Sequence, residues 1–378
     1  MNISRGKTIK TAIIGVGNCA SSLVQGISYC REMGDQAVGV SFPNLGGYKP
    51  QDVEIVAAFD VDARKVGKPV GEAVFALPNC THVFHADLAH ETAVVVRGPD
   101  LDGVSAYMKE QPDGHSFATS DAPEMSKDEV VTHLKASGAE VMIIFLPVGS
   151  LEAVAFYAEC ALAAGCALVN GIPVFIASDP AWAERFNTAG LPILGDDFKA
   201  QFGATIVHRA IAQLAALRGV KVDQTYQLNI GGNTDFLNMM VPERLVNKRE
   251  SKTESVQSAL GERLPEDGIR IGPSDYVRWL KDRKVAYIRL EGQLFGGVGT
   301  SMEIRLEVED SPNAAAEALS AIRCARIALD RGMSGSVDAA SAFLFKHPPK
   351  QMGDTAAYHS LMDFAAESDV GSDEGNAG

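Results

Sequence analysis

The sequence predicts an α/β protein in which a doubly wound parallel sheet is interrupted by a second α/β domain with an open sheet. Over the first 200 residues, short apolar runs alternate with helical patterns, which is typical of a parallel sheet covered on both faces. After Val220, apolar and polar residues alternate one by one, as in a sheet with one uncovered face. At 378 residues the chain is long enough for two domains.

The elements of the parallel sheet follow in order. Residues 9–14 form a short apolar run, 15–18 a glycine turn, and 20–30 repeat apolar side chains with helical spacing. A stretch rich in glycine and proline at 39–50 precedes a second apolar run at 53–59. The alternation continues with helices at 127–136 and 151–164 and with strands at 141–146, 167–169 and 191–194.

The second domain is predicted at residues 201–310. Its alternating strands, at 225–230, 286–290 and 302–308, surround a polar helix at 243–260. Such a sheet has one face that is either wet or covered by a partner.

The last part of the chain is predicted to return to the first domain. An alanine-rich helix with proline in its first turn runs over residues 311–331. The first domain therefore comprises residues 1–200 and 311–365. Residues 366–378 are acidic and rich in glycine and serine, and we expect a disordered tail there.

Charge and composition exclude several classes of function. With 34 basic and 48 acidic residues the net charge is 34 − 48 = −14, which disfavours binding to nucleic acid and to anionic membranes. No apolar run reaches the roughly 18 residues of a membrane span, and the start lacks a signal-peptide pattern. We therefore expect a cytoplasmic protein. Its six cysteines form no C-x-x-C pair and are predicted to be reduced, mostly buried thiols.

The glycine turn is half of a dinucleotide-binding fingerprint and indicates a Rossmann domain. Gly15 and Gly17 would let a pyrophosphate approach the backbone, and the amides that begin the helix would point at it. Ala20 stands where the third glycine is usual, and the Ser21 hydroxyl is a further candidate contact. Asp60 ends the second strand, where a carboxylate binds the ribose hydroxyls of NAD and repels the 2′-phosphate of NADP. The insertion at 39–50 explains why it lies more than the usual roughly 20 residues from the loop.

Two lysines are candidate catalytic residues. Lys248 and Lys252 are spaced i, i+4 on the predicted polar helix, so both ammonium groups lie on one face. Mutual repulsion and burial would lower both pKa values towards the range of proton transfer. Alternatively, the two bind a phosphate, or are simply solvated helix lysines. The nearby segment 229–238, with three asparagines, would suit a polyhydroxylated ligand.

Other catalytic signatures are weak. A G-x-S-x-G nucleophile motif is absent from the sequence. His82, His85 and His90 lie close together, but they lack the spacing and cysteines of a zinc site, so we interpret them as loop histidines.

Seven motifs, in order, resemble those of the myo-inositol-1-phosphate synthase family in its short bacterial and archaeal form. The resemblance extends from about residue 11 to 349. The motifs are GVGNCASS (15–22), FDVD (59–62), LPVGS (146–150), GDD (195–197), NIGGNTDFLN (229–238), DRK (282–284) and FLFK (343–346).

The resemblance implies an isomerase that uses NAD internally. Glucose 6-phosphate is oxidised at C5, enolised at C6, closed by aldol attack on C1, and reduced to 1D-myo-inositol 3-phosphate. It also implies that 201–310 is the catalytic and tetramerisation domain of a homotetramer, although a dimer is an alternative. Whether a mono- or divalent cation supports the site is left open.

Residue roles are carried over from the matching motifs. Lys248 would move the hydroxyl proton, and Lys252 would lie by the substrate phosphate. Lys284 would stabilise charge on the substrate, and Lys346 would contact the oxygen at C5. Asp197, Asn233 and Asp235 would bind hydroxyls, relay protons or hold the nicotinamide end. The residues that would bind the cofactor are Gly15, Gly17, Asn18, Cys19, Ala20, Ser21, Asp60, Pro147, Gly149, Ser150, Asp197 and Lys199.

One departure and three alternatives remain. Lys199 is followed by Ala200, where the family usually has serine, so a hydroxyl near the phosphate or nicotinamide is lost. The chain could instead be an NAD-dependent dehydrogenase of a sugar phosphate or amino acid, which would release NADH. A regulatory homologue would have lost active-site lysines. Finally, Asp197 and Asp235 could serve as an acid and base pair.

Overall fold

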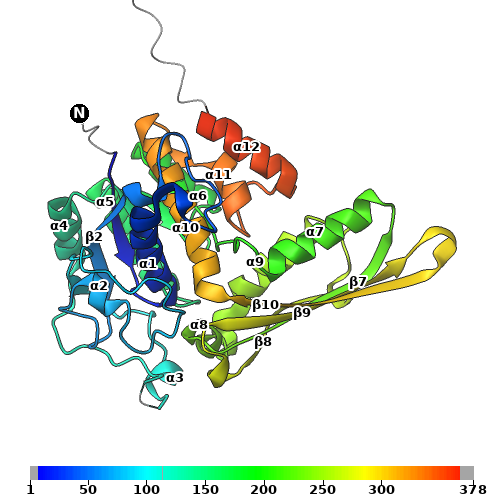
Figure 1. Cartoon of the computed structure of the whole chain (residues 1–378), viewed down its shortest axis with the longest axis horizontal. Coiled ribbons are helices and arrows are strands. Elements are labelled where there is room, and N and C mark those ends of the chain that lie inside the picture. The colour runs from blue at the N-terminus through cyan, green and yellow to red at the C-terminus, as the bar shows by residue number, and fades with distance from the viewer. Residues whose placement is uncertain (1–6, 113, 367–378) are drawn as a thin grey trace, which may run out of the picture.

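The computed structural model describes residues 7–112 and 114–366, which form two lobes, each built on its own sheet (Figure 1). The first, the parallel-sheet lobe, has seven strands in the order β11-β6-β5-β4-β1-β2-β3, all parallel. This order confirms the predicted doubly wound sheet, whose direction of winding reverses between β1 and β4. The strands are β1 (Ile9–Ile14), β2 (Val53–Asp60), β3 (Val95–Arg97), β4 (Val141–Ile144), β5 (Ala167–Asn170), β6 (Pro192–Leu194) and β11 (Gly335–Ser336).

Helices cover both faces of this sheet. Ile9 and Ile13 of β1 pack into the core cluster under α1 and α10, whereas Ala12 and Ile14 pack into the cluster under α4 and α5. A strand buried on both faces has to be mostly apolar, and β1 follows this rule except at Thr11, which is buried, and Lys10, which is exposed. The helices of this lobe are α1 (Asn18–Met33), α2 (Val70–Ala73), α3 (Ala106–Lys109), α4 (Lys127–Ser137), α5 (Leu151–Ala164), α6 (Pro180–Thr188), α10 (Asp310–Asp330), α11 (Asp338–Leu344) and α12 (Asp354–Ala366).

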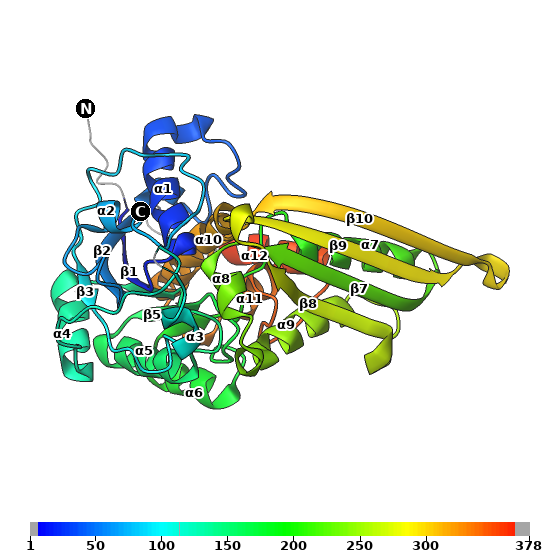
Figure 2. The same cartoon turned by 90° about the horizontal axis from the view of Figure 1, so that it is seen from below.

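The second, open-sheet lobe is a mixed sheet with the order β10-β9-β7-β8, covered on one face by helices (Figure 2). In β9 the side chains of Ala286, Ile288 and Leu290 are buried, whereas Tyr287 between them is 42% exposed. This alternation confirms the prediction of one uncovered face. Its elements are α7 (Ala204–Leu217), β7 (Lys221–Gly231), α8 (Thr234–Asn238), α9 (Val246–Gln257), β8 (Ile269–Tyr276), β9 (Arg283–Gln293) and β10 (Gly299–Glu309).

The chain returns to the parallel-sheet lobe through α10. This helix packs against α1 and against strands β1, β4, β5 and β6, as the sequence predicts. We propose domain boundaries near residues 200 and 311, which the two separate sheets support. The predicted tail begins too early, because Leu361, Phe364 and Ala365 are buried and hold α12 helical to Ala366. Residues 367–378 lie outside the described part of the chain.

Some elements differ from the predictions. Helix α7 lies where the domain boundary was expected, and β8 contains Gly272 and Pro273, which hide its strand pattern. The strand predicted at 141–146 ends at Ile144, because Phe145 and Leu146 leave the sheet and line a pocket. Among the described helices, none is long and apolar enough to cross a membrane.

Candidate active site

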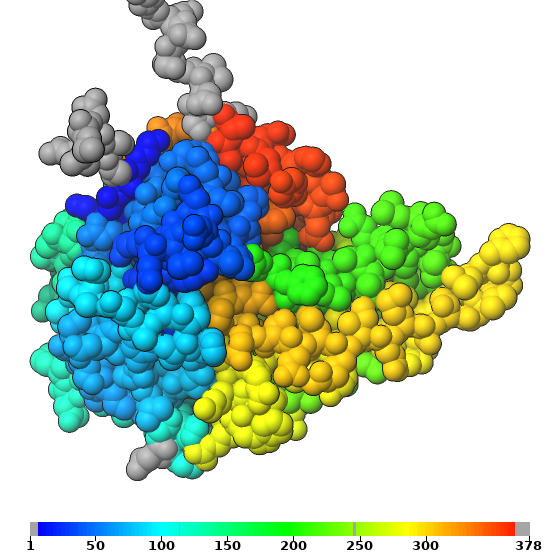
Figure 3. All heavy atoms as spheres, viewed as in Figure 1, coloured from blue at the N-terminus to red at the C-terminus, as the bar shows by residue number. Residues whose placement is uncertain are grey.

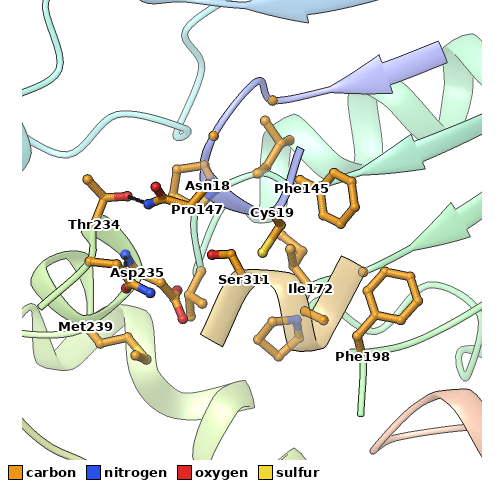
Figure 4. Close-up of a pocket in the computed structure, with 18 of the residues that line it drawn as sticks. Asn18, Cys19, Phe145, Pro147, Ile172, Phe198, Thr234, Asp235, Met239 and Ser311 are labelled. Carbon is orange, nitrogen blue, oxygen red and sulfur yellow. Dashed lines mark hydrogen bonds between the residues drawn. The ribbon is translucent and has the colours of Figure 1, made fainter. Parts of the chain in front are cut away.

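A single pocket holds most of the predicted site residues from both lobes (Figure 4). It opens at the carboxyl ends of β1 and β4, where doubly wound sheets bind their ligands. The Asn18 amide, at the start of α1, donates a hydrogen bond of 3.3 Å to Thr234 Oγ1, at the start of α8. This contact joins the two lobes at the floor of the pocket.

The two glycines of the loop have different roles. Gly15 has φ +91°, and a Cβ there would lie 2.8 Å from the carbonyl oxygen of Phe145, so its own backbone requires glycine. A Cβ on Gly17 would meet no described atom within 4 Å, so this glycine leaves space in the pocket. Gly17 is also the N-cap of α1 and makes no side-chain cap. Open space before uncapped helix amides fits a dinucleotide pyrophosphate.

The carboxylate of Asp60 already accepts several hydrogen bonds from the protein, which the sequence does not indicate. Its Oδ1 accepts hydrogen bonds from the amides of Val61 and Asp62, at 2.7 and 2.9 Å, and its Oδ2 accepts one from Val16 at 2.7 Å. A carboxylate has about four acceptor positions, so about one remains for a ribose hydroxyl. The buried Lys65 ammonium lies 3.8 Å from Oδ2, so a cation stands beside the carboxylate that was expected to repel phosphate.

Five of the predicted cofactor contacts do not line the pocket. Gly149 packs against Arg244, because a Cβ at Gly149 would lie 2.7 Å from the Cβ of that arginine. Ser150 Oγ donates to the carbonyl of Pro147, and Lys199 Nζ to the carbonyl of Ala342. Ala20 and Ser21 are fully buried in α1. The other seven predicted cofactor contacts line the pocket: Gly15, Gly17, Asn18, Cys19, Asp60, Pro147 and Asp197.

Asp197 is the centre of the polar part of the pocket. It accepts hydrogen bonds from Lys346 Nζ at 2.9 Å and from Ser251 Oγ at 2.8 Å, and Lys248 Nζ lies 3.5 Å away. Residues 196–199 pair antiparallel with 344–347, which brings Lys346 to Asp197 from far along the chain. Burial alone would raise the pKa of Asp197, but Lys248 and Lys346 hold it below its usual value.

The two lysines of α9 share a helix face, as predicted, but their pKa values are shifted in opposite directions. Burial alone would lower the pKa of Lys248, yet the carboxylates of Asp197 and Asp235 raise it above its usual value. The expectation of a lowered pKa is therefore wrong for Lys248. Burial and the neighbouring Lys284 lower the pKa of Lys252 well below its usual value, as predicted. Lys252 therefore loses its proton more readily than Lys248 does.

A second ion pair faces the first across the pocket. Lys284 Nζ lies 2.9 Å from Asp310 Oδ1 at the start of α10. Although burial alone would raise it, Lys284 and Lys248 hold the pKa of Asp310 below its usual value. Asp282 supports the pair by accepting hydrogen bonds from the amide and hydroxyl of Ser311, at 3.0 and 2.8 Å. Burial and the nearby Asp310 raise the pKa of Asp282 to about 6.

The polar segment 229–238 is only partly available to a ligand. Asn229 and Asn238 turn their amides to the carbonyls of Gly272 and Val148, both at 2.8 Å. Asn233 caps α8 and donates to Asp282 at 2.9 Å, and it lines the pocket with Asp235. Of this segment, residues 233–236 line the pocket, and the polar ones among them are Asn233, Thr234 and Asp235.

The amino-terminal end of α7 is another lining element. None of the described side chains caps it, and Gly203, Ala204 and Thr205 line the pocket next to Ala200. Free helix amides close to a lysine-rich wall are suited to a phosphate group. This end cannot be found from the sequence pattern, because no helix is predicted at residues 204–217.

Cysteine and metal chemistry find little support in the described residues. All six cysteines are free thiols, and four are buried, as predicted. Burial, with Asp310 adding to it, raises the pKa of the pocket thiol Cys19 to about 12, so it stays protonated. Within residues 7–112 and 114–366, no group of three His, Cys, Asp or Glu gathers as a metal site.

Ser251 and Asp310 are the site residues that sequence reasoning missed. Ser251 lies on the same face of α9 as Lys248 and Lys252, so the helical spacing could have indicated it. Asp310 directly precedes a predicted helix, and no local pattern distinguishes it from an ordinary first-turn carboxylate.

Several known proteins are similar to this chain. A family model described as myo-inositol-1-phosphate synthase matches residues 203–311. The inositol-3-phosphate synthase of Mycolicibacterium smegmatis is 50% identical over 362 residues, covering 94% of this chain and 97% of that protein. That of Corynebacterium glutamicum is 48% identical over 367 residues, covering 95% and 99%. The crystal structure of Ari2 matches with a TM-score of 0.75 and 32% identity, covering 96% of this chain and 99% of that one.

Proposed function

Because the chain belongs to the inositol-3-phosphate synthase family, we propose that its pocket converts D-glucose 6-phosphate to 1D-myo-inositol 3-phosphate with the help of NAD. One observation carries the assignment. Four lysines and the carboxylate of Asp197 line the same pocket as the glycine loop; the lysines are Lys248, Lys252, Lys284 and Lys346. A simple dehydrogenase needs one proton acceptor, whereas enolisation and ring closure also need cationic groups around a developing oxyanion.

NAD, when bound, supplies a hydride acceptor for C5 that later returns the hydride to the same molecule. The chain's own residues hold it: the space at Gly17 and the amides of α1 take the pyrophosphate, and Asp60 takes a ribose hydroxyl. Cys19 and Asp197 line the part of the pocket that leads on towards the lysines.

We assign proton handling to the pair around Asp197. Burial lowers the pKa of Lys346, which makes its amine a base for a hydroxyl proton. Asp197 Oδ1 lies 2.9 Å from Lys346 Nζ and 3.5 Å from Lys248 Nζ, so this carboxylate holds the two lysines close to each other. The motifs predict that Lys248 moves the hydroxyl proton and that Lys346 contacts the oxygen at C5. Because the pKa of Lys248 is raised and that of Lys346 is lowered, we exchange these two roles: Lys346 takes the hydroxyl proton, and Lys248 donates to the oxygen at C5.

The phosphate and the enolate oxygen are assigned to separate groups. The α7 amides at Ala204 and Thr205, with Lys252 opposite, would bind the phosphate. Lys284, held by Asp310, is placed to stabilise negative charge on the substrate as the C6 proton leaves.

The assignment is tested by incubating the protein with glucose 6-phosphate and NAD. Phosphorus NMR should show an inositol phosphate, while absorbance at the NADH band stays flat because the cofactor is regenerated. NADH formed in step with product would instead support the dehydrogenase alternative.

We predict that NAD binds at least about tenfold more tightly than NADP. Asp60 and Lys65 should have opposite effects on the ratio of the affinity for NAD to the affinity for NADP. Asp60→Asn keeps the size of the side chain but removes the charge that repels a 2′-phosphate, so it should narrow the ratio. Lys65→Met removes a cation that partly offsets that repulsion, so it should widen the ratio. Calorimetric titration measures both; equal ratios in all three proteins would contradict the assignment.

Substrate binding should take up a proton through Lys252. Burial and the neighbouring Lys284 lower its pKa, so its ammonium loses a proton more easily in the free site, and a bound phosphate dianion would favour the ammonium. Titration with glucose 6-phosphate at about pH 8, where phosphate is already a dianion because its second pKa is about 6, should give heats that depend on the buffer. Lys252→Met should abolish that dependence and raise KM about tenfold, with less effect on kcat. Identical heats in all buffers would contradict the role.

We propose a homotetramer assembled through the open-sheet lobe. Large apolar side chains are exposed there: Leu217 on α7 is 77% exposed, and Phe295 and Val298 lie at the tip of the β9–β10 hairpin. Figure 3 shows this hairpin projecting from the body of the molecule. We predict a solution mass four times the 40.1 kDa of the chain, and a smaller assembly for Phe295→Asp combined with Val298→Asp. Light scattering measures the mass, and a monomer at micromolar concentration would contradict the proposal.

We also propose a cytoplasmic location, since the phosphorylated substrate and NAD are charged molecules that do not cross membranes unaided. A mono- or divalent cation remains a proposal that rests on the family alone.

A further inference from the structure

Arg244 connects three segments: the turn before α9, the loop that follows β4, and the segment around Asp102. Its guanidinium donates hydrogen bonds to the carbonyl of Val148 at 2.8 Å, to Ser150 Oγ at 3.1 Å and to the carbonyl of Asp102 at 3.0 Å. The arginine belongs to the open-sheet lobe, whereas all three acceptors belong to the parallel-sheet lobe. Arginine suits such a junction because its planar head presents five donors in fixed directions.

The first two acceptors belong to the loop that follows β4. Pro147 and Val148 of this loop line the cofactor part of the pocket. Gly149, with φ +84°, leaves room for Arg244, whose Cβ would lie 2.7 Å from an added Cβ. The side chain of Asn238 also donates to the Val148 carbonyl, at 2.8 Å. Two side chains of the open-sheet lobe, those of Arg244 and Asn238, therefore hydrogen-bond to this loop.

The third acceptor belongs to a segment that closes another side of the pocket. Asp102 accepts hydrogen bonds from the amides of Glu152 and Ala153, at 2.8 and 2.9 Å, and so caps α5. Its neighbours Gly103 and Val104 line the pocket. A displacement of this segment, or of the loop after β4, would therefore change the hydrogen bonds of the same guanidinium.

On its own side, Arg244 lies at the entry to the lysine-bearing helix. The residue occupies the 3-10 turn Pro242–Leu245, which leads directly into α9. Lys248 follows four residues later, one helical turn further along, and its ammonium has to stay 3.5 Å from Asp197. Any shift of this turn would change that distance.

We propose that Arg244 is a positioning residue that couples occupancy of the cofactor pocket to the placement of Lys248 on α9. The proposal rests on the proposed function for the identity of NAD. Its direct test uses NAD without glucose 6-phosphate, so it stands or fails independently of the isomerase assay.

The test compares amide hydrogen exchange in the full-length protein with and without NAD. In the wild type, NAD should slow exchange over residues 246–257. In Arg244→Gln, NAD should still bind, but the slowing should be lost, and kcat should fall about ten- to a hundredfold with KM for glucose 6-phosphate within about threefold. Arg244→Lys keeps the charge without the fork and should behave like Arg244→Gln.

Arg263→Gln is the matched control. Arg263 also contacts α9, through Glu254 at 2.6 and 2.8 Å, but it is exposed and does not contact the cofactor pocket. It should leave both measurements unchanged. If Arg244→Gln fails to fold, Ser150→Ala removes one acceptor and should halve the NAD-dependent slowing. Full NAD-dependent protection of α9 in Arg244→Gln, or in Ser150→Ala where that variant replaces it, would overturn the proposal.

Discussion

Lys248→Ala is expected to lower turnover at least about a hundredfold while NAD still binds. The ammonium of Lys248 lies between Asp197 and Asp235, at 3.5 and 3.8 Å, and is the group assigned to donate to the oxygen at C5. General acid–base catalysis is worth about 10²–10⁴-fold, and lost oxyanion stabilisation adds a factor of about 10²–10³. NAD affinity should change little, because the glycine loop lies in the other lobe.

The control is the next residue of the same helix. Arg249 is exposed, so Arg249→Ala changes the charge of α9 without touching the pocket, and it should keep turnover within about twofold. The test measures steady-state turnover of both variants at saturating NAD, and it measures their affinity for NAD separately. Should Lys248→Ala keep more than about a tenth of wild-type turnover, the lysine assignment is wrong. Asp197 and Asp235 as an acid and base pair would then be the hypothesis to test.

The raised pKa of Lys248 is a property that could not be predicted from the sequence. Spacing on α9 correctly places Lys248 and Lys252 on one face, because helical periodicity is local. The sign of each pKa shift depends on which carboxylates the fold brings close. Asp197 and Asp235 come from two other segments and reach Lys248, while Lys252 is left among cations.

The cofactor loop shows the same division. Gly15 and Gly17 are predictable because a strand, a tight turn and a helix require them over a few residues. Gly149 is also a required glycine, but the neighbour that requires it, Arg244, lies 95 positions further along the chain. Ser150, in the same motif, holds Pro147 and Arg244 rather than cofactor. The motif therefore identifies the correct loop, but it does not distinguish the residues that line the pocket from those that hold the loop in place.

Fold prediction was limited in a comparable way. Strands β7 and β9 alternate between buried and less buried residues because only one face of their sheet is covered, whereas β1 and β2 are recognised as mainly apolar segments because both of their faces are covered. Strand β8 is interrupted by Pro273, and the period there is lost although the strand pairs in parallel with β7.

Asp197→Asn is expected to destabilise the protein and to abolish most activity, about a hundredfold or more. The Asp197 side chain is 3% exposed and is the closest carboxylate to both Lys346 and Lys248. Removing one partner of a buried ion pair costs about 3–5 kcal/mol, because the remaining charge is left without compensation. The lysines can relieve part of this cost by losing a proton, so we expect about 2–4 kcal/mol near pH 7.

The pH dependence separates this explanation from a simple loss of packing. Since the folded pKa of Asp197 is depressed, its carboxylate contributes stability above the unfolded value of about 3.9, and that contribution is lost as the pH falls through the folded pKa. The difference in unfolding free energy between wild type and Asp197→Asn should therefore be full at about pH 6 and should shrink below about pH 4. Urea unfolding at several pH values measures it, with Asp235→Asn as the control for stability. That carboxylate is 38% exposed and 3.8 Å from Lys248, so its removal should cost less than about 1 kcal/mol. A difference for Asp197→Asn that stays constant down to about pH 3 would mean that its charge does not hold the lysines, since only a titrating carboxylate can lose its contribution with acid.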